Sequence, residues 1–422
     1  LGSGLQNRVR QFESARYLTE ADSTNLSATQ HPLIMRKNLF TATLCVASLS
    51  IHAQSEVGTN ALFVNPQANV TIPYKCDDAG VSLPVEWGFD TAWLSDANVQ
   101  KGVNFIGKDK VGVVRVSFRA NAPLVNGTDL TADMKEKVAE RANIVIQRVG
   151  KKVPVVINCD QEAGIDDWYH GTASGTKLTS SHPERWVQNI KEHIKLFQEK
   201  GLTVIGVSPF NEPDYGWNQG TYHKDNEHNT TMEEMRLICK GMKEDPFFDG
   251  MRISGGNTLN CDCALPWYNY MKDYLDEGNT HQLAGEFDTY AGFFAAVRAD
   301  GNHATADELH NIMEAFVGAE YGMQTGIWWG SAERARAELM TASDGVRLGY
   351  GESRGTWMAG SVYRNTDNSI RAFIGQSERQ AQTTSFAFRS DRPVYYDGQG
   401  PTREMYVSVK GGTGYQVGTT NG

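Results

Sequence analysis

A carboxylate flanked by an amide and a proline, Asn211-Glu212-Pro213, directly follows the apolar segment 202–208. A carboxyl group placed at the end of a buried strand, beside an amide, suits general acid work. A surface loop with an exposed glutamate is the competing interpretation, since three residues match often by chance. The position at a strand end, followed by Asp214-Tyr215-Gly216-Trp217, favours chemistry. We therefore predict that Glu212 is a catalytic acid/base.

Acid/base chemistry at a glycosidic bond needs a second carboxylate on the opposite side of that bond. In retaining glycosidases the two carboxyl groups lie about 5–5.5 Å apart, and the second is the nucleophile. We predict Glu314 for this role, because it ends the apolar segment 309–314, which we assign to a seventh strand. Glu286 is the rival nucleophile and Glu320 a third choice. A helix over 306–316 is the alternative structure for this segment.

Polar and aromatic residues near other predicted strand ends are candidates for substrate binding. Arg115 interrupts a strand that is otherwise apolar, so it needs an anionic partner, either a catalytic carboxylate or a structural one. In Trp328-Trp329 we expect one ring in the core and one, Trp329, in the cleft. Sugar rings present apolar C–H groups to aromatic faces, and the remaining candidates to contact a sugar are Asp160, Trp168, Trp217 and Tyr290.

The elements that position these residues alternate between short apolar segments and amphipathic ones. This alternation predicts parallel strands joined by helices, an α/β fold. Eight such units favour a closed (β/α)8 TIM barrel, whose site lies at the carboxyl ends of the strands. The predicted strands are 85–89, 111–118, 153–158, 202–208, 251–255, 282–287, 309–314 and 326–329.

The helices are predicted from spacing and from their ends. Apolar residues recur every three or four positions over 131–148, 232–242 and the segment before Gly201. Ser181-x-x-Glu184, with Pro183 in the first turn, is read as a capping box that opens the last of these.

Both ends of the chain differ from the barrel pattern. Short strands and turns after about residue 350 predict a small appended antiparallel β-sandwich domain, to which a strand within 61–73 is expected to add. Met35, two basic residues and the apolar segment 39–51 are typical of a secretory signal. The expected organisation is a disordered upstream segment 1–34, a signal peptide 35–53, N-terminal strands of the β domain 54–84, a barrel 85–349 and a β domain 350–422.

Composition limits the partners. The 422 residues include 40 Lys and Arg against 50 Asp and Glu, a net charge of −10. Nucleic acid binding needs clustered basic residues, so neither nucleic acid nor an anionic membrane is an expected partner. No second Cys or His pair has zinc spacing, so no metal site is expected. Cys261 and Cys263 form one local bridge or none.

Together these residues resemble the clan A glycoside hydrolases, and among them glycoside hydrolase family 30 or a close relative. The resemblance rests on Asn211-Glu212-Pro213 after the fourth strand, a glutamate after the seventh, Trp328-Trp329 on the eighth and Arg115 on the second. It implies that Glu212 is the acid/base, that Glu314 is the nucleophile and that Asn211 hydrogen-bonds the sugar 2-hydroxyl. It also implies retention at β-linked glycans without a cofactor. The short spacing from Glu314 to Gly326 departs from the family pattern.

The expected function is therefore a secreted, extracellular or periplasmic, retaining endo-β-glycanase, with cellulose-, xylan- and galactan-type chains all open. No membrane span is expected beyond the signal. Two alternatives remain: an exo-acting β-glycosidase, and a non-catalytic glycan-binding protein on a degenerate barrel. The separation of the two carboxylates distinguishes the enzyme from the binding protein.

Overall fold

The computed structural model describes residues 67–120, 122–159, 182–214, 230–330, 333–377 and 380–411. The predicted upstream segment and signal peptide lie outside these ranges, as do Asp160, Trp168 and Trp217. Within them, none of the helices has the length and apolar character needed to cross a bilayer.

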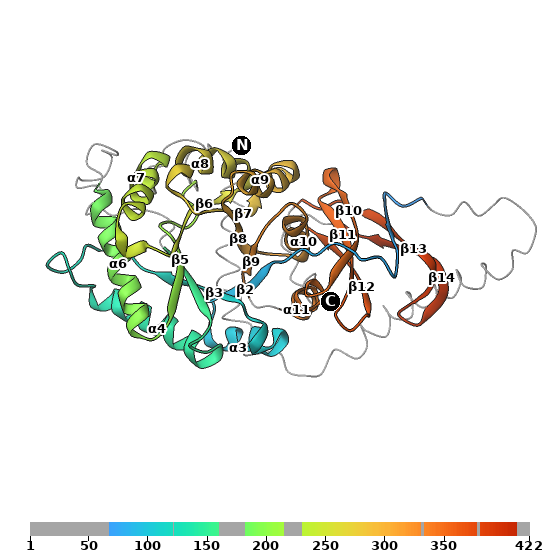
Figure 1. Ribbon diagram of the computed structural model, residues 1–422, viewed down its shortest axis with the longest axis horizontal. Helices are drawn as coiled ribbons and strands as arrows, with labels where there is room; N and C mark the ends of the chain where they lie inside the picture. Colours follow the sequence, from blue (N-terminus) through green and yellow to red (C-terminus); the bar gives the residue numbers. More distant parts are fainter. Residues whose placement is uncertain are drawn as a thin grey trace, which may run out of the picture. The chain divides into compact units, whose positions relative to one another are not determined.

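Eight parallel strands close into a barrel, which Figure 1 shows beside the sheets of β10–β14 (residues 346–409). The middle strands are buried on both faces, which explains their nearly continuous apolar sequences. The closed barrel confirms the predicted α/β architecture. Its strands, in order, are β2 (Glu86–Asp90), β3 (Val113–Phe118), β4 (Pro154–Cys159), β5 (Thr203–Ser208), β6 (Arg252–Asn260), β7 (Glu277–Ala284), β8 (His303–Leu309) and β9 (Thr325–Trp328).

Helices follow these strands and cover the barrel (Figure 1). Thr131 and Thr231 cap two of them, and Thr231 forms a capping box with Glu234. The capping box predicted at Ser181 is wrong, because the helix begins at Pro183 with His182 as its N-cap and no side-chain cap. The helices are α3 (Asp96–Ile106), α4 (Ala132–Arg148), α6 (Pro183–Glu199), α7 (Met232–Lys243), α8 (Cys261–Met271), α9 (Phe287–Ala299), α10 (Ile312–Glu320) and α11 (Arg334–Ser343), with short 3-10 turns η2 (Lys108–Lys110), η3 (Pro246–Phe248), η4 (Lys272–Tyr274) and η5 (Arg354–Thr356).

Two predicted strands are misplaced. The sixth barrel strand ends at Ala284, whereas we predicted 282–287. The prediction for 309–314 is wrong: the seventh strand, β8, ends at Leu309, and α10 begins at Ile312. The helical alternative for this region was nearer to the structure. This shift of the seventh strand changes which glutamate stands at its carboxyl end.

Beyond the barrel strands, two three-stranded sheets share a second, smaller core. Segments from opposite ends of the sequence meet here, since β1 pairs in parallel with β13. Ile72 and Phe386 from one sheet and Met358 and Val362 from the other are buried in the same cluster. The strands are β1 (Val70–Tyr74), β13 (Thr384–Tyr396) and β14 (Gln399–Val409) in one sheet, and β10 (Val346–Ser353), β11 (Met358–Arg364) and β12 (Ile370–Gln376) in the other.

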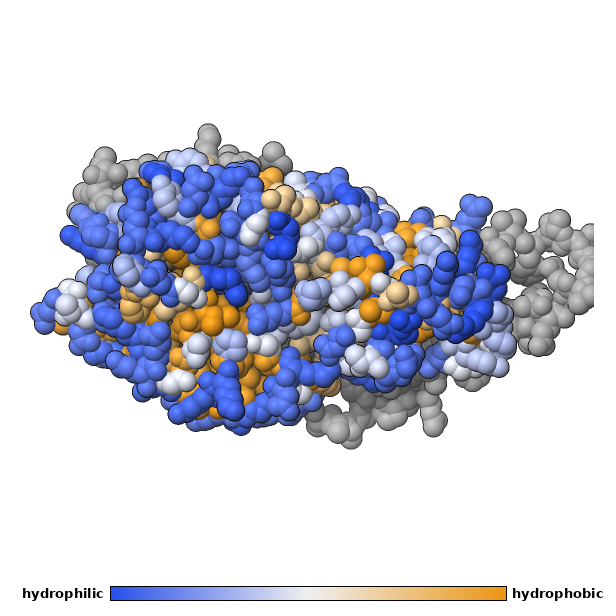
Figure 2. Space-filling view, viewed as in Figure 1, coloured by the Kyte–Doolittle hydropathy of each residue, from blue (hydrophilic) through white to orange (hydrophobic). Residues whose placement is uncertain are grey.

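The distribution of side chains agrees with this layering. The face in Figure 2 is mainly hydrophilic, with apolar side chains gathered in patches. Helix α10 packs closely against the sheet of β10, β11 and β12, since a Cβ added at Gly375 of β12 would clash with Met313 of α10. Cys261 and Cys263 are both buried free thiols, so no bridge joins them.

Candidate active site

Glu212 lies just beyond the carboxyl end of β5, the fourth barrel strand, on a backbone with unusual geometry. Its φ is +48°, a left-handed conformation that side chains other than glycine rarely adopt. The Glu212 N–H donates to the carbonyl of Asn257 at 3.0 Å, and Asn257 itself has a φ of +49°. Strain of this kind persists only where neighbouring structure holds it, and it clusters at functional sites.

Asp214 holds the same loop from its other side. Its two carboxylate oxygens accept the backbone N–H groups of Leu259 and Asn260 at 2.8 and 3.0 Å. Burial raises the pKa of Asp214 to about 7, although these two N–H groups work in the opposite direction. The loop that carries Glu212 is thus attached to the end of β6 at two points.

Two adjacent acids, Asp307 and Glu308, lie near the carboxyl end of β8, the seventh barrel strand. Neighbouring residues of a regular strand point to opposite faces. The pairing of β8 with β9 is irregular between Ala306 and Leu309, so the two acids between them can both face Arg115. Both acids contact Arg115: its Nε lies 3.2 Å from Asp307, and its Nη1 donates to Glu308 Oε1 at 2.6 Å.

Arg115 is completely buried on β3 and connects several strand ends. In addition to the two acids of β8, it lies 3.8 Å from Asp90 at the end of β2. Its Nη2 donates to Asn211 Oδ1 at 2.6 Å, and Asn158 Nδ2 donates to the same oxygen at 3.0 Å. Two donors on Oδ1 fix the orientation of the Asn211 amide, so Nδ2 is the Asn211 group left to donate to a ligand.

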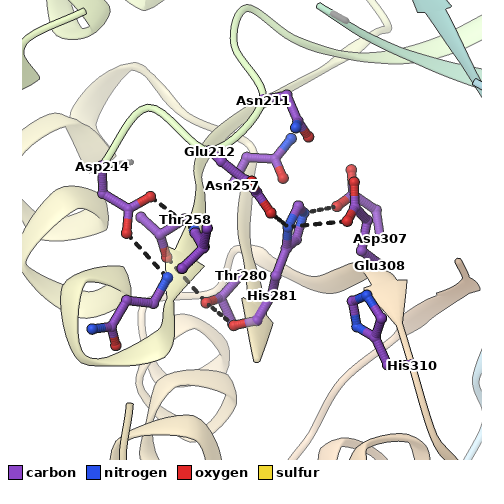
Figure 3. Close-up of polar contacts among 12 residues, drawn as sticks. Asn211, Glu212, Asp214, Asn257, Thr258, Thr280, His281, Asp307, Glu308 and His310 are labelled. Carbon is purple, nitrogen blue, oxygen red and sulfur yellow. Dashed lines mark hydrogen bonds and ion pairs between the residues drawn. The ribbon is translucent and has the colours of Figure 1, made fainter. Parts of the chain in front are cut away.

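His281 joins the two halves of the site. Its Nδ1 lies 2.9 Å from Glu212 Oε1, and its Nε2 lies 2.8 Å from Asp307 Oδ1 (Figure 3). Nδ1 is also 3.5 Å from Glu308 Oε2. The imidazole, fully buried on β7, therefore bridges the fourth and seventh strand ends.

The carboxylates of Glu212 and Glu308 face each other across the barrel mouth. One ligand atom from each of Glu212, His281 and Glu308 lies within 4.8 Å of the others. This places a carboxylate oxygen of Glu212 within that distance of one of Glu308. Such a separation fits a retaining pair, at about 5–5.5 Å, and is shorter than the roughly 6.5–9.5 Å of an inverting pair.

Charges around the seventh strand keep its two acids ionised. Burial by itself raises the pKa of Asp307, but Arg115 and His281 outweigh it and lower this pKa to about 2. The pKa of Glu308 is also below its ordinary value. Burial raises this pKa, but the positive charges of His281 and Arg115 lower it by more than burial raises it. A carboxylate kept in its charged form is suited to act as a nucleophile.

His281 and Asp90 respond to the same charges in different ways. Burial lowers the pKa of His281, but the carboxylates of Glu308, Asp307 and Glu212 raise it well above its ordinary value. For Asp90, burial is the largest influence and raises the pKa to about 7, although Arg115 lowers it. The carboxylates thus favour the charged form of His281, whereas burial favours the neutral form of Asp90.

The structure places the three other candidate glutamates away from this arrangement. Glu314 lies in the first turn of α10, where its oxygens accept the His310 N–H at 2.8 Å and Asn311 Nδ2 at 2.7 Å. Glu286 is the exposed N-cap residue of α9, and its N–H donates to Asp262. Glu320, at the end of α10, forms an ion pair with Arg347 at 2.7 Å.

The aromatic candidates also separate. Trp328 is fully buried and stacks on Trp87 with ring centroids 5.6 Å apart, whereas Trp329 is half-buried, 5.3 Å from the ring of His310. Trp329 is thus the ring of this pair that a ligand can reach. Tyr290 is buried in α9 and donates to the Glu314 carbonyl at 3.1 Å, so its ring is not available to stack on a sugar.

Sequence reasoning missed Asp307, Glu308 and His281. Two consecutive acids before Leu309 could have indicated a strand end, since acids are rarely buried in a strand without a function or a partner. The buried Arg115 was the other available signal, because an arginine inside a barrel requires carboxylates on neighbouring strands. His281 carried no local signal in the sequence.

No protein-family model matches the chain, and no curated protein matches its sequence. Several solved structures are similar to it. A GH30 endoxylanase from Clostridium papyrosolvens C71 is 15% identical, with 77% of this chain and 88% of that one covered and a TM-score of 0.47. A glycoside hydrolase family 30 subfamily 8 xylanase from Clostridium acetobutylicum is 13% identical, with 81% and 96% covered and a TM-score of 0.47.

An endo-β1,6-glucanase is 11% identical to the chain, with 81% of this chain and 91% of that one covered and a TM-score of 0.48. At these identities and TM-scores the likeness carries no argument about activity.

Proposed function

We propose that this protein is a retaining glycoside hydrolase, with Glu212 as acid/base and Glu308, in place of Glu314, as nucleophile. The observation that carries the proposal is the approach of these two carboxylates to within 4.8 Å at the ends of the fourth and seventh barrel strands. A carboxylate pair at this separation, at the ends of these two strands, suits double displacement at a glycosidic carbon.

In the first step a Glu308 oxygen attacks the anomeric carbon as the glycosidic C–O bond breaks. Glu212 donates its proton to the departing oxygen, which leaves as an alcohol. Arg115 holds Glu308 Oε1 at 2.6 Å, so Oε2, on the His281 side, is the oxygen free to attack. The lowered pKa of Glu308 supplies this nucleophile in its ionised form.

In the second step Glu212, now a carboxylate, takes a proton from water. The resulting hydroxide attacks the anomeric carbon, and the bond to Glu308 breaks. His281 contacts Glu212 at 2.9 Å and Asp307 at 2.8 Å, so these contacts hold the Glu212 side chain in position through both steps. Asn211 Nδ2 is oriented to donate to a sugar hydroxyl. The resemblance to glycoside hydrolase family 30 implies the same role, a hydrogen bond to the sugar 2-hydroxyl.

For the substrate we propose a β-linked polysaccharide cleaved in an endo manner by a secreted enzyme. The Asn211-Glu212-Pro213 motif and the signal-like segment 35–53 support this finer assignment. Trp329 is the candidate for stacking on a sugar ring. The non-catalytic alternative loses support, because a binding protein does not require an ionised carboxylate within 4.8 Å of a second one. Exo action remains the alternative mode of cleavage.

The test uses a panel of β-glycans together with aryl glycosides of the sugar that the panel identifies. Glu212→Ala is expected to lower kcat/KM by about 10²–10⁴-fold on substrates with poor leaving groups, because they need a proton donor. Activated aryl glycosides should lose much less. Added azide should restore turnover of the aryl glycoside in Glu212→Ala and give a glycosyl azide of retained configuration.

Glu286→Gln is the matched control, since Glu286 is an exposed glutamate outside the site. It should keep wild-type rates on every substrate. Equal losses on good and poor leaving groups in Glu212→Ala would contradict the acid/base role. If the wild type cleaves no glycan on the panel but binds one, the glycan-binding alternative replaces the proposal.

A further inference from the structure

The three groups closest to the scissile position are also a set of metal ligands. Glu212, His281 and Glu308 each offer one donor atom, all within 4.8 Å of one another, and all three residues are buried. A mixed set of one imidazole and two carboxylates is more selective than a cluster of acids. Imidazole nitrogen favours zinc and its neighbours among the transition metals over magnesium or calcium.

We propose that Glu212, His281 and Glu308 bind one divalent transition-metal ion, with Zn²⁺ as the fitting ion, and that this ion blocks the active site. A tetrahedral zinc ion about 2.0–2.1 Å from its ligands needs donor atoms about 3.3 Å apart. His281 Nδ1 already lies 2.9 Å from Glu212 Oε1 and 3.5 Å from Glu308 Oε2. Binding therefore requires movements of a few tenths of an ångström around the imidazole and a closer approach of the two carboxylates.

A fourth residue, outside the ligand set, orients the imidazole for this purpose. Asp307 Oδ1 lies 2.8 Å from His281 Nε2, whereas Glu212 Oε1 lies 2.9 Å from Nδ1, the other ring nitrogen (Figure 3). A carboxylate on the distal nitrogen of a metal-binding histidine fixes its tautomer and strengthens it as a ligand. With the proton of Nε2 held by Asp307, Nδ1 is directed at the space between Glu212 and Glu308.

The surrounding charge favours a cation. The carboxylates of Glu212, Asp307 and Glu308 lie around the proposed site, with Arg115, His281 and His310 as the neighbouring basic groups. Arg115 does not occupy the proposed site, because it contacts Oε1 of Glu308 and leaves Oε2 towards His281. A divalent cation placed among these carboxylates would neutralise part of their negative charge.

An ion in this place lies between the two carboxylates that must flank a glycosidic bond. It would occupy the acid/base and the nucleophile together, so inhibition should be competitive with the glycan. This inhibitory consequence rests on the proposed function, whereas the binding of the ion does not. The metal site can therefore be tested separately from catalysis.

The binding test is a titration of the chelator-stripped full chain with ZnCl₂ against a chromophoric chelator, with MgCl₂ as the ion control. We expect one bound Zn²⁺ per chain. His281→Gln should abolish binding or weaken it at least tenfold, and Asp307→Asn should weaken it by about 10- to 100-fold. His193→Gln is the matched control, because His193 is a fully buried histidine on α6, outside the site. Thermal unfolding checks that each variant is folded. If His281→Gln does not fold, the zinc affinity of Asp307→Asn alone tests the site.

Zinc should also inhibit glycan cleavage competitively, with full recovery after EDTA. Absence of zinc binding to the wild type, or unchanged affinity in His281→Gln and Asp307→Asn, would overturn the proposal. Unchanged cleavage with one zinc ion bound would do so as well. A chain that binds zinc as predicted but cleaves no glycan supports the metal site and contradicts the proposed function, so the two failures are distinguishable.

Discussion

Glu308 and Glu314 are two buried glutamates in one short segment, and their surroundings are opposite in kind. Glu308 takes its partners from distant parts of the chain, Arg115 on β3 and His281 on β7. Glu314 takes its own from the preceding turn, the His310 N–H and the Asn311 side chain. Their exposed fractions, 4% and 1%, are nearly the same, so burial does not distinguish them.

The difference shows what each carboxylate stabilises. A charge at the N-terminus of a helix satisfies free N–H groups and the helix dipole, a local role that many buried acids have. A charge held by a buried arginine and a histidine from other strands is positioned relative to the whole barrel mouth. We therefore distinguish a site carboxylate from a helix cap by its partners: those of a site carboxylate lie far away in the sequence, and those of a helix cap lie in the adjacent turn. Four predictions test this comparison.

The largest effect is expected for Glu308→Gln. The variant keeps the size of the side chain but removes the nucleophile, so kcat/KM should fall by about 10⁴-fold or more. Thermal unfolding checks that the variant is folded. Glu308→Gly with azide and an activated aryl glycoside should recover turnover and give a glycosyl azide of inverted configuration. Wild-type rates in Glu308→Gln would reject the assignment.

Arg115→Lys should affect both stability and activity. Lysine keeps the charge but cannot contact Asp307, Glu308 and Asn211 together, since it lacks the planar fork of arginine. We expect a loss of about 3–5 kcal/mol in the free energy of unfolding, typical of a broken buried ion pair. Urea denaturation measures it. An unchanged unfolding free energy would show that the Glu308 side of the comparison is not held by this arginine.

Asp90→Asn should change how stability depends on pH. The pKa of Asp90 is about 7 in the folded chain against 3.8 as its ordinary value, so the folded state binds this proton more tightly. Its contribution to stability is present below about pH 4 and is lost as the pH rises to about 7, at most about 4 kcal/mol. Urea titrations at pH 4, 5.5 and 8 should therefore show a smaller fall with pH in Asp90→Asn than in the wild type.

The control for this experiment is Asp344→Asn, because Asp344 is exposed and pairs only with Lys110 among the contacts described. It should follow the pH dependence of the wild type. Parallel curves for the wild type and Asp90→Asn would mean that burial behind Arg115 does not shift this acid.

Glu314→Gln should have the smallest effect, and on stability alone. Glutamine can accept only one of the two hydrogen bonds that Glu314 accepts, which leaves a buried donor unpaired. The expected cost is about 1–3 kcal/mol in unfolding free energy, with kcat/KM within a few fold of the wild type. Loss of activity comparable to that of Glu308→Gln, in a folded variant, would reverse the roles assigned to the two glutamates.

The barrel and the loop that carries Glu212 were predictable because their signals are local. Strands such as β3 and β5 are short apolar segments buried on both faces, and Asn211-Glu212-Pro213 follows β5 directly. The second core also carried a signal, in the alternating residues around β1 and in the turns between the C-terminal strands. In these regions the order of residues along the chain is enough to indicate the structure.

The seventh strand was not predictable in this way. Its sequence, His-Ala-Thr-Ala-Asp-Glu-Leu, places two acids in a buried strand, and the more apolar segment that follows belongs to α10. The charge partners of these two acids, Arg115 and His281, come from other strands, and Arg115 lies 192 positions before Asp307. His281 was missed for a related reason, since the sixth strand was predicted to begin after it and its partners lie on other strands.

The most direct test of the central claim is to trap the glycosyl-enzyme. The wild type would be incubated with a 2-deoxy-2-fluoro-β-glycoside of the sugar that the glycan panel identifies, digested with protease and sequenced by mass spectrometry. The account predicts one covalent glycosyl group per chain, attached to Glu308. A label on Glu314 or Glu286, or inactivation without any label, would contradict it.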